Sequence, residues 1–65
     1  MQAEERQERI EEHLLRMAFA SLEELSELVD ASVATVRRDL GVLEGKGTVQ
    51  RTHGGAKLVN PKPDE

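Results

Sequence analysis

The sequence predicts a small α+β domain that is mostly helical, in which three helices precede a two-stranded antiparallel hairpin. Apolar residues recur at helical spacing in two segments, and a Ser-x-x-Glu pattern typical of a helix start lies between them. Glycines then separate two short β-type runs. A length of 65 residues allows one such domain. We expect it to span residues 1–59, with residues 60–65, which contain both prolines, forming an extended linker.

The first helix is expected from Ala3 to about Met17. Ile10, Leu14 and Met17 lie four and three residues apart, so they share one face of a helix that is otherwise rich in Glu, Gln and Arg. That face is predicted to be buried, and the polar face to be solvated. Residues 19–20 then form a brief extended step.

The second helix is predicted to be short. Ser21 and Glu24 supply the capping pattern ahead of an apolar stripe that contains Leu25 and Val29. Asp30 follows, and aspartate tolerates the left-handed backbone conformation better than most residues. We therefore expect a tight connection between the second and third helices at this point.

The third helix is expected to begin at Val33, with Ser32 as its N-cap. Its apolar residues form one stripe because they repeat at intervals of three and four. They are Val33, Val36, Leu40 and Leu43. Arg38 lies nearly opposite the centre of this stripe, whereas Arg37 and Asp39 lie on its two flanks. The outward face is therefore small except for Arg38.

A basic hairpin follows this helix. The glycines on either side of Lys46 are expected to end the helix, and residues 48–51 and 56–59 to form two strands joined through residues 52–55. Three helices followed by a hairpin define a winged helix-turn-helix.

The charge of the chain is strongly divided. The net charge is −4, but residues 1–30 carry nine acidic residues against three arginines, which gives −6. Residues 31–63 carry six basic residues against two acidic ones, which gives +4. A ligand responds to the local field, because physiological salt screens charges beyond about 8 Å. The C-terminal half can therefore bind a polyanion despite the acidic average.

A helix that presents an arginine opposite its buried face can enter a major groove, and a basic hairpin can hold the flanking phosphates. We therefore predict sequence-specific binding of double-stranded DNA by the third helix and the wing. The predicted DNA-binding residues are Ser32, Ala34, Thr35, Arg37, Arg38, Arg51, His53 and Lys57. Arg38 is expected to pair with a guanine edge; the alternative is that it is solvated or bonds to Asp39 or Glu44 within the chain. Arg37 is expected either to bind a phosphate or to pair with a carboxylate.

Other classes of function have less support. The chain has no cysteine, and its Ser, His and acidic residues form no recognisable catalytic set, so we predict no enzyme activity. Neither histidine has further ligands beside it, so no metal and no other cofactor is predicted. The lack of a long apolar segment or a signal-like N-terminus favours the cytoplasm. The alternative function is a winged-helix protein-interaction module that uses the acidic first helix and does not bind DNA.

The segment TVRRDLGVLEGKGTVQRTHGGA resembles the DNA-binding domain of the DeoR family of bacterial transcriptional repressors. The shared features are the Ser-x-x-Thr-hydrophobic-Arg-Arg-Asp-Leu helix at Ser32–Leu40, the pair Leu43-Glu44, Gly47, Arg51, and the ending His53-Gly54-Gly55-Ala56. Two positions depart from the family pattern: Asp30-Ala31 replaces a glycine and an aliphatic residue, and Gly41 replaces a larger polar residue. The opening Glu5-Arg6-Gln7 with Ile10, and Ser21 with Leu25, also fit the family pattern, so the resemblance covers nearly the whole chain.

The resemblance also implies partners beyond this chain. Members of the family join this domain to a C-terminal sensor that binds phosphorylated sugars or related metabolites and oligomerises. These 65 residues are not expected to contain such a sensor, and the linker at residues 60–65 would lead into it. The chain is thus expected to be the operator-binding part of a homo-oligomeric repressor of carbohydrate metabolism genes, with a sugar-phosphate effector that belongs to the missing domain.

Overall fold

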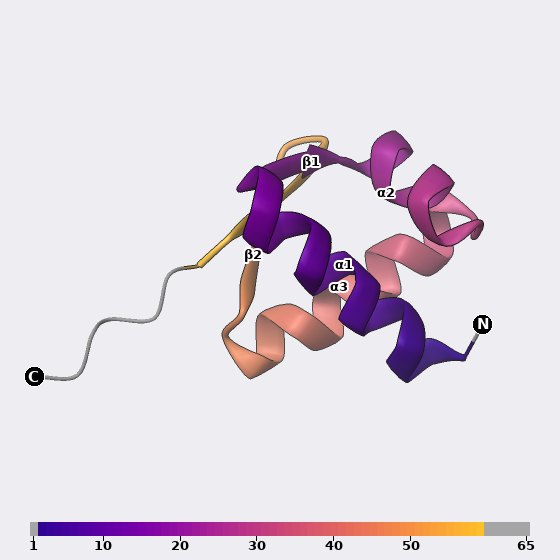
Figure 1. Ribbon diagram of the computed structural model, residues 1–65, viewed down its shortest axis with the longest axis horizontal. Coiled ribbons are helices and arrows are strands. Elements are labelled where there is room, and N and C mark those ends of the chain that lie inside the picture. Colours follow the sequence, from indigo (N-terminus) through magenta and orange to yellow (C-terminus); the bar gives the residue numbers. More distant parts are fainter. Residues whose placement is uncertain (1, 60–65) are drawn as a thin grey trace, which may run out of the picture.

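A computed structural model of the chain, which describes residues 2–59, contains three helices and one three-stranded antiparallel sheet in that range (Figure 1). The elements in chain order are α1 (Ala3–Met17), β1 (Phe19–Ser21), α2 (Leu22–Val29), α3 (Val33–Lys46), β2 (Val49–Thr52) and β3 (Gly55–Leu58). The predicted winged helix-turn-helix is confirmed. The predicted linker at residues 60–65 lies outside the described residues.

Side-chain caps define where α2 and α3 begin. The Ser21 hydroxyl accepts a hydrogen bond from the Glu24 backbone N–H at 3.0 Å, and the Ser32 hydroxyl accepts one from the Thr35 N–H at 3.1 Å. Each bond satisfies a donor that the first turn of a helix leaves unpaired. Asp30, between the two helices, has the left-handed conformation (φ 53°, ψ 49°). These features confirm the predicted helix starts and the predicted tight connection.

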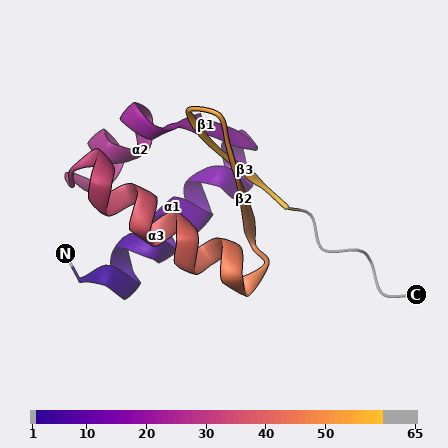
Figure 2. The same ribbon diagram turned by 180° about the vertical axis from the view of Figure 1, so that it is seen from behind.

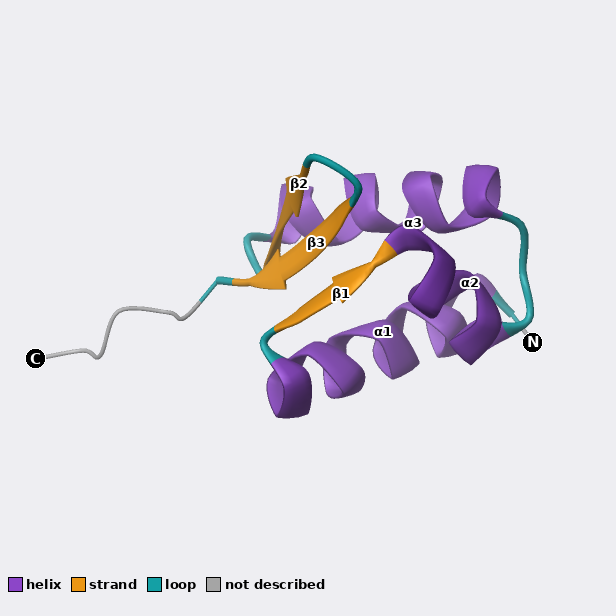
Figure 3. Ribbon diagram, turned by 90° about the horizontal axis from the view of Figure 1, so that it is seen from above, coloured by secondary structure: helices purple, strands orange, loops and turns teal. Residues whose placement is uncertain are grey.

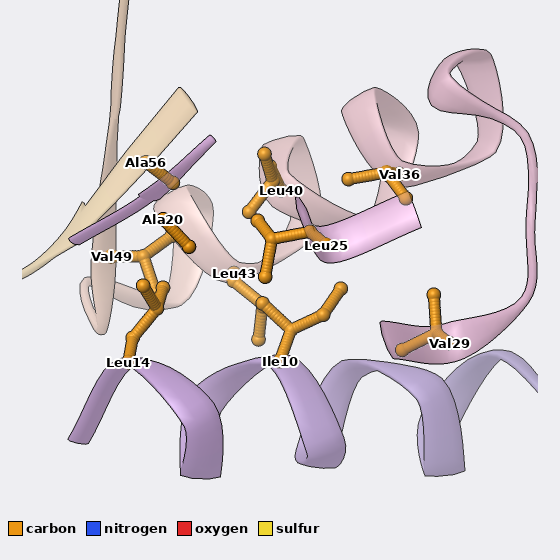
Figure 4. Packing of buried hydrophobic residues seen from close by; sticks show 10 residues of the cluster. All are labelled: Ile10, Leu14, Ala20, Leu25, Val29, Val36, Leu40, Leu43, Val49 and Ala56. Atoms are coloured by element: carbon orange, nitrogen blue, oxygen red, sulfur yellow. The ribbon is translucent and has the colours of Figure 1, made fainter. Parts of the chain in front are cut away.

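The core lies where the three helices and the sheet meet (Figure 4). It consists of Ile10, Leu14, Ala20, Leu25, Val29, Val36, Leu40, Leu43, Val49 and Ala56. The predicted stripes of α2 and α3 supply much of it. The prediction for Met17 was wrong, because its side chain is 57% exposed. The helix ends at Met17, and Ala18, with a φ of 71°, turns the chain into β1 before that side chain reaches the core.

The wing contains one strand more than the sequence predicted. β3 is the central strand of the order β1-β3-β2, so β1 pairs with the hairpin across the sheet. A Cβ atom on Gly55 would lie 2.3 Å from the Ala20 carbonyl oxygen, so only glycine permits this close approach. The hairpin loop is His53-Gly54, where Gly54 has a φ of 87°. The two-stranded wing was therefore correct but incomplete.

The arrangement leaves one long side of α3 uncovered. Figure 2 shows α3 in front, with α1 behind it and the β2–β3 hairpin beside its C-terminal half. Figure 3, seen from above, shows the strands beside the C-terminal halves of α1 and α3, while α2 lies near the other end. The outward side of α3 and the hairpin thus form neighbouring parts of one surface.

Candidate nucleic-acid interface

The N-terminal turn of α3 presents small polar and apolar groups. The Ser32 hydroxyl donates to the Thr35 hydroxyl oxygen at 3.0 Å, in addition to capping the helix. The Thr35 hydroxyl donates to no acceptor among residues 2–59, so its proton can reach an outside acceptor. Ser32 and Ala34 are exposed, and Thr35 is half-buried. This end of the helix can approach a surface closely, and its backbone N–H groups favour an anion.

Arg37 and Arg38 are both exposed on the middle of α3. Neither arginine forms an ion pair within residues 2–59. Asp39 and Glu44, which were the alternative partners for Arg38, are bound by Arg6 and Arg51 instead. Both guanidinium groups therefore keep their donors for an external ligand.

Asp39 lies on the buried side of α3, with 2% of its side chain exposed, rather than on an outer flank. Its carboxylate accepts hydrogen bonds from the Arg6 Nε and terminal amino groups and from the Gln7 amide, the last at 3.1 Å. Burial acts to raise the pKa of Asp39, but the bonds from Arg6 and Gln7, with the charges of Arg6 and Arg38, hold that pKa below its ordinary value. The same contact raises the pKa of Arg6. An ionised pair thus joins α1 to α3.

A second ion pair joins α3 to the wing. The Arg51 Nε atom donates to a carboxylate oxygen of Glu44 at 2.9 Å, and the Arg51 backbone N–H approaches the other oxygen at 3.4 Å. Both side chains are partly exposed, at 53% for Arg51 and 38% for Glu44. The pair spans an open cleft between α3 and the hairpin. The cleft is lined by Leu22, Arg37, Leu40, Glu44, Arg51, Thr52, His53, Gly54 and Gly55.

Lys57 stands apart from this cleft. Cross-strand partners share one face of a sheet, and Arg51 pairs with Ala56, which also pairs with the buried Ala20. Arg51 is therefore on the face turned toward the core and α3. Lys57 alternates with Ala56 along β3, so it lies on the opposite, outer face beside Phe19. The structure brings Arg37, Arg51 and His53 together and leaves Lys57 on the other side of the sheet.

Three polar residues of the site were not assigned from the sequence. Arg6 and Gln7 bind Asp39 across 33 and 32 residues of chain, and Glu44 binds Arg51 across seven. The sequence contains one indication that Asp39 is buried. It lies three residues after Val36 and four before Leu43, which is the spacing of the buried stripe.

Residues 2–59 contain neither a candidate membrane span nor a candidate metal site. Within residues 2–59 no helix is long and apolar enough to cross a membrane. No three His, Asp or Glu side chains in the same range are grouped closely enough to hold a metal ion.

Three helices precede a basic hairpin, and two arginines on the uncovered side of α3 make no ion pair within residues 2–59. These features define a winged helix-turn-helix of the DNA-binding class. The family described as the DeoR-like helix-turn-helix domain matches residues 6–62, and the chain belongs to that family.

Curated relatives of the chain are transcriptional regulators. It is 40% identical to the HTH-type transcriptional regulator GolR of Listeria innocua over 85% of this chain and 22% of that protein. It is 39% identical to the lactose phosphotransferase system repressor of Lactococcus lactis over 95% of this chain and 24% of that protein. The L-fucose operon activator of Haemophilus influenzae is 57% identical over 57% of this chain and 15% of its own length. The chain thus spans about a quarter or less of these relatives, and no solved structure matched it.

Proposed function

We propose that this chain is the operator-reading domain of a bacterial transcriptional regulator, with α3 in the major groove of a specific duplex and the wing along the backbone. The observation that carries this proposal is the pairing of the acidic residues of α3. Asp39 and Glu44 are occupied by Arg6 and Arg51, so Arg37 and Arg38 remain exposed and without ion pairs among the described residues. A duplex presents the acceptors that these two arginines lack.

Within this arrangement the residues of α3 have different roles. Arg38, nearly opposite the buried stripe, pairs with the O6 and N7 atoms of a guanine, as an arginine in the major groove commonly does. Arg37 lines the cleft beside the wing and binds a backbone phosphate. Thr35 donates its hydroxyl proton to a phosphate at the N-terminus of α3. Ser32, whose own hydroxyl proton is bonded to Thr35, contributes its backbone N–H, and the small side chain of Ala34 permits close approach.

The wing residues fix the position of the domain on the backbone. Arg51 and His53 line the cleft and reach the phosphates next to the groove that α3 occupies. Lys57, on the outer face of the sheet, contributes its charge at longer range. These contacts carry no sequence information, so they strengthen binding to every duplex alike.

The regulator that contains this domain is proposed to repress genes of carbohydrate metabolism by blocking their transcription. It is proposed to be a cytoplasmic protein and to have no enzyme activity. The names of the relatives that concern lactose and L-fucose support the link to carbohydrates. A longer protein with a C-terminal sensor is proposed to form the homo-oligomer and to bind the sugar-phosphate effector. When two such domains are linked, binding of the first raises the effective concentration of the second at its half-site, so the pair binds DNA more tightly than a single domain does.

Titration of the 65-residue chain with a mixed-sequence duplex at several salt concentrations tests the proposal. Phosphate contacts require log K to fall as log[salt] rises, by about 0.9 for each phosphate bound. The double variant Arg37→Ala/Arg38→Ala should bind much more weakly. The matched control, Arg9→Ala/Arg16→Ala, removes the same charge from exposed positions of α1 and should bind nearly as the parent does. Absence of binding at low salt would refute DNA binding and leave the protein-interaction module as the remaining hypothesis.

A further inference from the structure

We infer that Glu44 is a positioning residue for DNA binding, which holds Arg51 in the cleft so that the outer end of its guanidinium group receives a backbone phosphate. The inference rests on the proposed function. It assigns a role in DNA binding to an acidic residue, although the negative charge of DNA by itself favours only basic residues.

The contact geometry determines which donors of Arg51 are used. One carboxylate oxygen of Glu44 binds the Nε atom at 2.9 Å, at the inner end of the guanidinium group. The other oxygen approaches the backbone N–H of the same residue at 3.4 Å, which ties the carboxylate to strand β2. The terminal amino groups of Arg51 make no hydrogen bond within residues 2–59. They are the groups that bind a phosphate in a two-point contact.

The surroundings of the pair favour an anion. Arg37 and His53 line the same cleft, together with the backbone of the tight turn at Gly54. Among the residues that line the cleft, Glu44 is the only acidic one, and its charge is offset by Arg51. A phosphate at the terminal amino groups therefore meets Arg51 first and has a second guanidinium group close by.

Two opposing effects of Glu44 can be separated by measurement. Its negative charge repels a phosphate, which weakens binding. Its contact with Arg51 restricts a long side chain that otherwise samples many rotamers, and this lowers the entropic cost of binding. Because Glu44 approaches Arg51 from the Nε side and also contacts the strand backbone, we expect the ordering effect to exceed the repulsion.

A double-mutant cycle on the 65-residue chain tests the inference, with a mixed-sequence duplex of about two helical turns as the probe. The variants are Glu44→Ala, Arg51→Ala and the double variant, with Glu12→Ala as the control that removes one exposed acidic residue from α1. Glu44→Ala should weaken binding by about two- to fivefold, the factor that an exposed ion pair can be worth. It should also lower the salt slope by part of the roughly 0.9 that one phosphate contact contributes. Glu12→Ala should not weaken binding.

The Arg51→Ala background provides the decisive comparison. If Glu44 acts through Arg51, adding Glu44→Ala to Arg51→Ala causes no further weakening, and removal of the repelling charge makes binding slightly tighter. Binding by Glu44→Ala that equals or exceeds the parent would overturn the inference, because Glu44 would then only repel. Equal weakening in both backgrounds would overturn it too, since the effect would come from the fold. Absence of binding by the parent would reject the proposed function and this inference with it.

Discussion

The carboxylate of Asp39, buried in α3, is bound by Arg6 from the first turns of α1. Gln7 donates a further bond to the same carboxylate at 3.1 Å and is itself buried. The buried stripe of α3 and this ion pair hold the same side of the helix against the rest of the domain. Arg37 and Arg38 lie on the exposed part of its surface.

Loss of the Asp39 carboxylate should destabilise the fold. Asp39→Ala leaves the Gln7 amide and the Arg6 guanidinium without their acceptor, and the free energy of unfolding should fall by about 2 to 4 kcal/mol. Urea denaturation followed by circular dichroism measures this change. Glu12→Ala, at an exposed position of α1, is the matched control and should change the stability by about 0.5 kcal/mol or less. Similar losses for the two variants would contradict a role for the buried pair.

Acid should weaken the folded state through the same residue. The pKa of Asp39 is lower in the folded state than its ordinary value, so its stabilisation is complete above an unfolded pKa of about 3.9. The stabilisation is lost as the pH falls through the lower, folded pKa. Asp39→Asn cannot titrate, so its stability should fall less than that of the parent below about pH 4. Parallel stability curves for the two proteins would show that Asp39 has no shifted pKa.

The contact between β1 and the hairpin should depend on Gly55. Gly55→Ala places a methyl group 2.3 Å from the Ala20 carbonyl oxygen and should cost about 1 to 3 kcal/mol. Hydrogen exchange gives a local measurement, because the Leu22 and Leu58 amides, bonded to Gly54 and Ala18 across this contact, should lose protection.

Gly45 offers a matched control for that substitution. It lies in α3, is exposed, and has open space around its missing Cβ atom. Gly45→Ala should therefore raise the stability by roughly 0.5 to 1 kcal/mol. A stable Gly55→Ala variant with full protection at Leu22 and Leu58 would disprove the close approach.

Neighbouring leucines of α1 should respond very differently to truncation. Leu14 is fully buried and Leu15 is 67% exposed. Leu14→Ala removes core contacts and leaves a cavity, which should cost about 2 to 5 kcal/mol. Leu15→Ala should change the stability by about 0.5 kcal/mol or less. Comparable losses at both positions would mean that α1 buries a different face.

The helices could be predicted from the sequence because their signals are local. The Ser21 and Ser32 caps lie within three residues of the groups they bind, and the stripe of α3 repeats within eleven residues. The family resemblance, which the match over residues 6–62 confirms, likewise rests on local spacing.

Pairing over long distances could not be predicted in this way. β1 has three residues, too few for an alternating pattern, and its partner lies more than thirty residues later. The burial of Asp39 depends on Arg6, which is equally remote, and a charged residue beside two arginines is ordinarily placed at the surface. Lys57 and Arg51 lie on opposite faces of the sheet. Which face each occupies depends on the strand register, and the His53-Gly54 turn and the pairing with β1 set that register.

The ratio of the affinities of Arg38→Ala for a selected and a mixed-sequence duplex, compared with the same ratio for the parent, shows whether α3 reads bases. A duplex selected by the parent chain from a random library and a mixed-sequence duplex are titrated with both proteins at one salt concentration. We predict that Arg38→Ala loses about 1 to 3 kcal/mol on the selected duplex beyond its loss on the mixed one, while Arg51→Ala weakens both equally. Equal losses for Arg38→Ala on the two duplexes would show that Arg38 does not read a base, which would contradict sequence reading by α3.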